Sequence, residues 1–142
     1  MNQLQSMTID ELLETFDSLE DWEERCDYLI DLGFELPELP AEYKTDENRV
    51  RGCQSIVWLV ADVKTNGSPI IELMADSDAF IVKGLIAVLL TLFSGRSPDE
   101  ILSTDVDTIF RRIGLDRHLS STRQNGLHSM VKRIRGIAAQ AI

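Results

Sequence analysis

The stretch that decides the fold is Ser55–Met74, SIVWLVADVKTNGSPIIELM. Its first part, Ser55–Val63, is rich in β-branched and aromatic residues, which favour a strand. The tetrapeptide TNGS at 65–68 follows, and Asn-Gly tolerates the positive φ angles that a type I′ turn requires. Pro69–Met74 then returns as a second strand. The sequence therefore predicts an antiparallel β-hairpin, with a third strand that the pattern alone does not place.

Two helices are predicted before the hairpin. Thr8 and Glu11 form a capping-box pattern ahead of apolar residues at helical spacing. A second helix starts near Asp21, and we expect Gly33 to end it. The segment at 34–52, FELPELPAEYKTDENRVRG, has prolines and no periodicity, so it is predicted to be an extended surface connection.

The chain after Ala79 is predicted to be helical. Phe80–Phe93 is nearly all apolar, which predicts a central helix, and its expected cap is Asp76, Ser77 or Asp78.

Three further helices follow this central one. Ser97-Pro98-Asp99-Glu100 is a capping box with proline at the first helical position. A short helix over 105–113 stops at Gly114, and the last helix begins near position 120 or 121. Residues 1–142 are therefore predicted to form a single α+β domain, a small antiparallel sheet covered by helices.

Composition restricts the class of protein. Of the 142 residues, 44% are hydrophobic and 27% charged, the mixture of a soluble globular chain. The longest apolar stretch, Phe80–Phe93, is shorter than the roughly 18 to 20 residues that span a bilayer. The N-terminal sequence has no basic region followed by an apolar run, and its early acids argue against a transit peptide, so we expect neither a secretory signal nor a transit peptide. We expect no membrane association and a cytoplasmic, reducing location.

Charge is distributed unevenly along the chain. The net charge is −10, yet residues 1–47 hold 15 acids and 2 bases, a local sum of −13. An acidic first third argues against nucleic acid as a partner. The basic stretch at 111–135 is interpreted as the solvated face of a helix in preference to a docking patch.

The two cysteines, Cys26 and Cys53, are too few for a disulfide framework and lack zinc-site spacing. Cys53 follows Gly52 directly before the first strand, and glycine lets the backbone present a thiol at a loop tip. Arg49 and Arg51 are close in sequence, and a nearby cation stabilises a thiolate. A small buried residue that enters a strand explains Cys53 equally well on local features.

Other candidate residues give weaker patterns. Cys26 shares an apolar helix face with Trp22 and Ile30, which predicts a buried, inert thiol. His118 and His128 have no metal-ligand spacing with a cysteine, and both are expected to be ordinary surface residues. No metal site is predicted.

Five ordered segments resemble the SufE family of sulfur-acceptor proteins, including its CsdE relatives, from about residue 8 to residue 140. They read WEERCDYLIDLG, LPELP, NRVRGCQSIVWLV, DSDAFIVKGLIAVLL and LSSTRQNGLHSM. Their order is far more specific than the GCQS loop alone. The resemblance implies a three-stranded antiparallel sheet with flanking helices, similar to IscU cluster scaffolds. One departure is Cys26, where relatives tend to carry an aromatic residue.

The resemblance also implies a mechanism. In such proteins an acceptor cysteine takes sulfane sulfur from the persulfide of a cysteine desulfurase, stimulates that enzyme and delivers the sulfur to an iron–sulfur scaffold. Cys53 matches the acceptor position. The chain would be a sulfur-transfer partner without a cofactor of its own, and not an enzyme. The desulfurase would be of the SufS or CsdA type and keep its own pyridoxal phosphate, and the recipient would be a scaffold such as a SufBCD-type complex. The fold class is compatible with a weak homodimer.

Further residues match positions in the family's motifs. Asp76 and Arg123 are expected to shape the cysteine pocket or the docking surface. Supporting or docking roles are implied for Arg51, Gln54 and Ser55, with Trp58 as a further support of the loop.

Other functions compete with sulfur transfer. A cluster scaffold has a similar fold, but a [2Fe–2S] cluster usually needs four ligands, which two cysteines do not supply in one chain. A thiol hydrolase would pair Cys53 with His118 or His128. A purely structural adaptor would have no need of Cys53.

Overall fold

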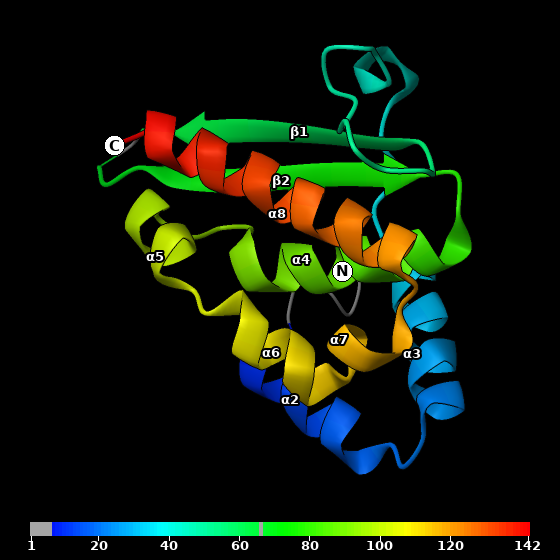
Figure 1. Ribbon diagram of the computed structural model, residues 1–142. Helices are drawn as coiled ribbons and strands as arrows, with labels where there is room; N and C mark the ends of the chain where they lie inside the picture. Colours follow the sequence, from blue (N-terminus) through cyan, green and yellow to red (C-terminus); the bar gives the residue numbers. More distant parts are fainter. Residues whose placement is uncertain (1–6, 66) are drawn as a thin grey trace.

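The computed structural model describes residues 7–65 and 67–142. Two strands form a hairpin, and helices precede it and follow it in the sequence (Figure 1). The elements are α2 (Ile9–Ser18), α3 (Trp22–Phe34), the 3₁₀ turn η1 (Ala41–Tyr43), β1 (Val57–Lys64), β2 (Ile70–Ser77), α4 (Phe80–Phe93), α5 (Pro98–Ser103), α6 (Val106–Ile113), α7 (Leu115–His118) and α8 (Ser121–Gln140).

Helix α4 forms the centre of the core, as predicted from its apolar sequence. Ten of its 14 residues are buried, because α4 packs against β2 and against α3. Helix α8 passes in front of the hairpin in the view of Figure 1 and adds its own buried face to the core. A helix that is apolar on all sides requires such cover on all sides.

Glycines allow α3 and α4 to approach closely. A Cβ atom at Gly84 would overlap the carbonyl oxygen of Leu29, and one at Gly33 would lie 2.9 Å from the backbone nitrogen of Gly84. The prediction that Gly33 ends its helix is therefore wrong. Helix α3 continues through Phe34, and Gly33 provides space at the helix crossing.

The predicted hairpin is confirmed. Strands β1 and β2 pair antiparallel, with Val57 opposite Ser77 and Lys64 opposite Ile70. Asn66 of the predicted turn lies outside the described residues, while Gly67 has φ +90°.

The expected three-stranded sheet is corrected to two strands in the described part of the chain. The segment before β1 makes one isolated bridge, between Arg49 and Trp58, beside a hydrogen bond of 2.9 Å from the Val50 amide to the Val57 carbonyl. The chain then leaves the sheet at Gly52, where φ is +88°. A third strand does not form because this pairing ends after one bridge.

Most predicted helix starts are confirmed. At each of these starts, the side chain of the N-cap residue accepts a hydrogen bond from the backbone amide three positions later. Helix α4 is the exception. Its N-cap is Ala79, which has no capping side chain, so the predicted caps Asp76, Ser77 and Asp78 are wrong. Asp78 instead accepts a hydrogen bond from the Ile56 amide at 3.1 Å, which ties the start of α4 to the segment before β1. The confirmed caps are Thr8, Asp21, Ser97 and Ser120, and the helix predicted from about 105 begins at Val106 with Asp105 as its cap.

Two segments differ from the predicted pattern. The connection between α3 and β1 is not extended throughout, since η1 interrupts it and Leu39 and Val50 are buried. The short helix α7 was not predicted from the sequence pattern. Within the described ranges, no helix combines the length and the apolar character that a bilayer crossing requires.

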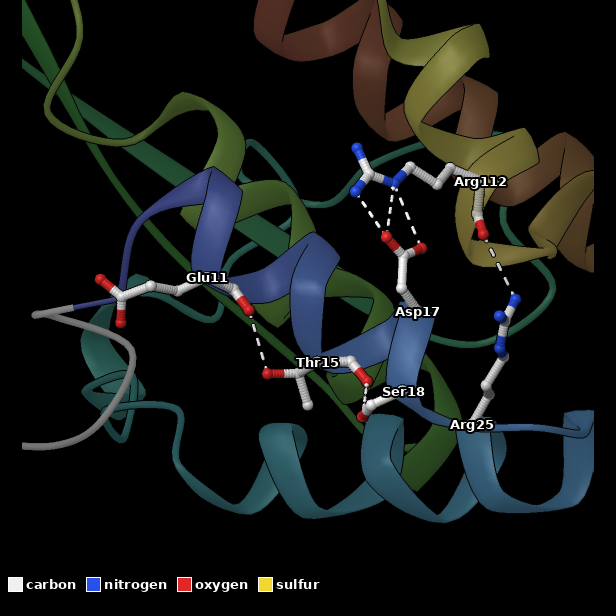
Figure 2. A network of polar contacts seen from close by, with 6 residues as sticks. All are labelled: Glu11, Thr15, Asp17, Ser18, Arg25 and Arg112. Atoms are coloured by element: carbon white, nitrogen blue, oxygen red, sulfur yellow. Dashed lines mark hydrogen bonds and ion pairs between the residues drawn. The ribbon is translucent and has the colours of Figure 1, made fainter.

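Two arginines connect the first helices to α6 (Figure 2). Arg112 Nε donates to Asp17 Oδ2 at 3.1 Å, and Arg25 Nη1 donates to the Ile113 carbonyl at 2.7 Å. The hydrogen bond from Arg112 holds the pKa of Asp17 below its ordinary value. Because this ion pair is exposed, it orients α2 against α6 without contributing much stability.

Replacement of Gly84 by alanine tests the helix crossing. We expect Gly84→Ala to lower the free energy of unfolding by about 1–3 kcal/mol or more, because α3 must move away from α4. The matched control is Gly136→Ala in α8, where an added Cβ meets no atom within 4 Å. That change should be neutral or stabilise by up to about 1 kcal/mol. Urea denaturation measures both, and equal stabilities of the two variants would contradict the proposed crossing.

Candidate functional site: the cysteine pocket

The loop before β1 lies on the first half of α8. Gly52 of this loop has φ +88°, and a Cβ atom there would lie 2.5 Å from Ser129 Oγ. A side chain at position 52 would therefore be both strained and crowded. Glycine is the residue that allows the loop to lie directly on the helix.

Cys53 also contacts α8. Its thiol donates to the Gly126 carbonyl at a sulfur–oxygen distance of 3.5 Å, and the side chain is half-buried. Gly126 has no side chain, so the thiol lies directly against the helix backbone. A Cβ atom at Gly126 would come within 3.4 Å of Cys53 Sγ.

A small cavity of about 40 Å³ adjoins the thiol. A water molecule requires roughly 10–15 Å³, so the cavity has space for more than one water-sized group. Its walls come from the cysteine loop, the start of β1, the start of α4 and the first half of α8. The lining residues are Cys53, Gln54, Ser55, Val57, Val82, Leu85, Thr122, Arg123, Gly126, Leu127 and Met130.

The environment of Cys53 favours the neutral thiol. Burial raises its pKa above the ordinary value. The sequence-based expectation of a thiolate stabilised by Arg49 and Arg51 is therefore not met in this conformation. Arg51 is exposed and lines a different groove, with Lys132 and Arg133.

Arg123 is the charged residue of the pocket lining. Its Nη1 atom is buried and has no hydrogen-bond partner among the described residues. A buried donor without a partner carries a desolvation cost of about 1–3 kcal/mol, and more when the group is charged. The guanidinium is thus a cation with an unused donor next to the cysteine cavity.

Asp76 lies outside the pocket lining. It is 9% exposed and forms ion pairs with Lys44 at 3.3 Å and Lys83 at 3.6 Å. Lys44 also lies 5.2 Å from the ring centroid of Trp58, the cross-strand neighbour of Asp76. These contacts attach the end of η1 to the sheet and to α4.

The structure thus brings four of the predicted site residues together. Cys53, Gln54, Ser55 and Arg123 share one cavity, whereas Arg51 and Asp76 lie elsewhere. The functional residue that the sequence analysis missed is Gly126. Its signal was a glycine inside a predicted helix, which costs about 1 kcal/mol relative to alanine and calls for a packing reason.

The remaining candidates take no part in this pocket. Cys26 is half-buried at the edge of the face that α3 buries, so the prediction of a fully buried thiol is wrong. His118 is exposed and stacks on Trp22 with ring centroids 4.8 Å apart, and His128 is exposed on α8. Among residues 7–65 and 67–142, no group of three or more His, Cys, Asp or Glu is placed to hold a metal ion.

Alkylation kinetics test the protonation state of Cys53. Because the thiolate reacts and burial raises the thiol pKa, we expect the iodoacetamide rate at Cys53 to rise about tenfold per pH unit from pH 6 to 8. The rate should remain below that of free cysteine at each pH. Peptide mass spectrometry separates Cys53 from Cys26. A plateau below pH 8 would mean a lowered pKa and would contradict this description.

Comparison with known proteins agrees with this fold and extends it. The sequence model of the family described as SufE, Fe-S metabolism associated domain, matches residues 10–138. An uncharacterized SufE-like protein of Rhizobium etli is 49% identical over 129 residues, which cover 90% of this chain and 87% of the relative. An uncharacterized SufE-like protein of Rhizobium meliloti is 45% identical over 132 residues, or 92% and 94% of the two chains.

A solved structure has the same architecture. The solution structure of a hypothetical protein from Thermus thermophilus superposes with a TM-score of 0.74 at 26% identity, and the match covers 95% of this chain and 98% of that one. The family match and the two relatives span nearly the whole sequence. The chain therefore belongs to the SufE family, whose domain is associated with iron–sulfur metabolism.

Proposed function

We propose that Cys53 accepts sulfane sulfur from a cysteine desulfurase and passes it to an iron–sulfur scaffold. The observation that carries this proposal is a thiol on a loop directly after a glycine of positive φ, beside a small cavity lined by Arg123, whose buried Nη1 has no hydrogen-bond partner among the described residues. Membership of a family associated with iron–sulfur metabolism supports the same reaction class. In this proposal the chain is a sulfur carrier that also stimulates the desulfurase, and it is not itself an enzyme.

The transfer step is a thiol–persulfide exchange. The Cys53 thiolate attacks the outer sulfur of the donor persulfide, and a new S–S bond forms at Cys53 Sγ. The S–S bond of the donor breaks, and its electron pair leaves on the donor cysteine sulfur. Electrons balance without an external oxidant or reductant, so the chain needs no redox cofactor for this step. The pyridoxal phosphate that releases sulfur from free cysteine belongs to the desulfurase.

The resting pocket and the reaction make opposite demands on the thiol. Burial raises the Cys53 pKa, which keeps the sulfur protonated and less open to oxidation. Attack requires the thiolate. In the proposal, the loop leaves the pocket when a donor binds. Exposure of the thiol to water then removes the burial that raises its pKa.

Arg123 offers a second way to stabilise charge. Arg123 lines the cavity next to Cys53, and its buried Nη1 has no hydrogen-bond partner within the described part of the chain. A persulfide on Cys53 is an anion at neutral pH, and an anion in this cavity would give the guanidinium a partner. We propose that Arg123 stabilises the loaded form of the carrier.

The polar contacts of Cys53 itself are few enough to be broken on binding. Among the described residues, Cys53 makes one long side-chain hydrogen bond, to α8, and Arg51, Gly52 and Gln54 are exposed on either side of it. Loop rearrangement on binding is common among regulatory interactions. A SufS- or CsdA-type desulfurase as donor and a SufBCD-type complex as recipient fit this scheme, in a reducing cytoplasm where both thiols stay free.

Peptide mass spectrometry tests the transfer. After incubation with a SufS-type or CsdA-type desulfurase and free cysteine, we expect the peptide that contains Cys53 to gain the mass of sulfur. Cys53→Ser should abolish that gain and the stimulation of the desulfurase. The matched control is Cys26→Ser, which should retain both, since Cys26 lies on α3 outside the pocket lining. Full stimulation by Cys53→Ser would sink the proposal.

A further inference from the structure

A second cavity lies beside the cysteine loop and shares no lining residue with the cysteine pocket. It occupies about 450 Å³ between Val50–Arg51 and the second half of α8. We call it the basic groove. The charged residues that line it are Arg51, Lys132 and Arg133, and no acidic residue is among its lining.

The groove leaves positive charge without a partner. Arg133 donates to the backbone carbonyls of Glu47 at 2.8 Å and Arg49 at 3.4 Å. Arg51 and Lys132 are exposed, and within the described part of the chain neither side chain makes a hydrogen bond or an ion pair. In a chain with a net charge of −10, this local excess of cations is a place where an acidic partner gains electrostatic energy.

The lining of the groove is not purely polar. Val50 is buried and Ile137 half-buried, and a Cβ atom on Gly136 would meet no atom within 4 Å. The open helix surface at Gly136 therefore lies next to apolar groups and cations. A protein segment with carboxylates and an apolar side chain complements such a mixture. A nucleic acid would face the repulsion of the 15 acids in residues 1–47.

The groove is continuous with the cysteine loop. Arg51 lines it two residues before Cys53, and Gly52 between them lies against Ser129, another lining residue. Gly126, Ser129 and Arg133 follow one another at about one-turn intervals along α8. A partner that contacts Arg51 and Lys132 would therefore touch the loop that holds the thiol in its pocket.

We propose that the basic groove binds an acidic segment of the sulfur-donating desulfurase. This inference rests on the proposed function and adds the surface by which the donor reaches the loop. The donor is the partner that needs the Cys53 thiolate and therefore the loop out of its pocket, and Arg51 of the groove lies two residues before Cys53 on that loop. Binding there places the donor beside Arg51, from which it can draw the loop out of the pocket.

A charge reversal tests the groove. We expect Lys132→Glu to weaken binding of a SufS-type desulfurase at least fivefold at about 0.1 M salt, as measured by calorimetry. The difference should shrink at about 1 M salt, because the Debye length falls from about 10 Å to about 3 Å. The matched control is Arg117→Glu on α7, an equally large charge change at an exposed residue outside both cavities. It should bind as the wild type does, and equal melting temperatures check that both variants fold.

Several results would overturn this assignment. The first is a Lys132→Glu variant that binds the desulfurase with wild-type affinity, and the second is an equal loss of desulfurase affinity in Lys132→Glu and Arg117→Glu. The third is a protein whose Lys132 is needed to bind a 20-nucleotide RNA but not to bind the desulfurase. Failure of the proposed function looks different, since the desulfurase would then bind through Lys132 while Cys53 gains no sulfur at saturation. A wild type that binds neither SufS-type nor CsdA-type desulfurase overturns both proposals.

Discussion

The contact between the cysteine loop and α8 is the constraint on which the site depends. Gly52 lies against Ser129, and Cys53 lies against the backbone of Gly126, so the loop follows the helix surface with almost no space for side chains. This contact brings the thiol beside its cavity and raises its pKa through burial. Arg51, two residues before Cys53, lines the basic groove instead. The contact of the loop with α8 thus leaves the Cys53 thiol and the surface proposed to bind the desulfurase in two different cavities.

The core explains why this crossing is held in place. Helix α4 is buried on most sides and fixes both β2 and α3, with Gly84 allowing the close approach of α3. The start of α4 is tied to the segment before β1 through Asp78 and Ile56. Val82 and Leu85 of the same helix form one wall of the cysteine cavity. The cysteine site therefore lies where the most apolar helix, the hairpin and α8 meet.

Sequence patterns predicted those elements that local chemistry determines. The hairpin, most caps and the apolar central helix follow from alternation, side-chain oxygens and composition, and the structure confirms them. The end of α3 was mispredicted because Gly33 serves helix packing, which depends on a residue 51 positions later. The prediction of a third strand was wrong because pairing of the segment before β1 stops where Gly52 turns toward α8. Within the candidate site, the motif made Cys53 the candidate acceptor, but its raised pKa and its contact with Gly126 depend on a helix that begins nearly 70 residues later. No local pattern carries that information.

The central claim is that the contact of Gly52 with α8 keeps Cys53 closed and protonated until a partner draws the loop away. The most direct measurement compares the iodoacetamide rate at Cys53 in Gly52→Ala with that in Gly67→Ala at pH 7.5. Both glycines have positive φ, +88° and +90°, but an added Cβ at Gly67 meets no atom within 4 Å, while one at Gly52 meets Ser129. We expect faster alkylation in Gly52→Ala than in the wild type and an unchanged rate in Gly67→Ala. A folded Gly52→Ala variant with the wild-type rate would contradict it.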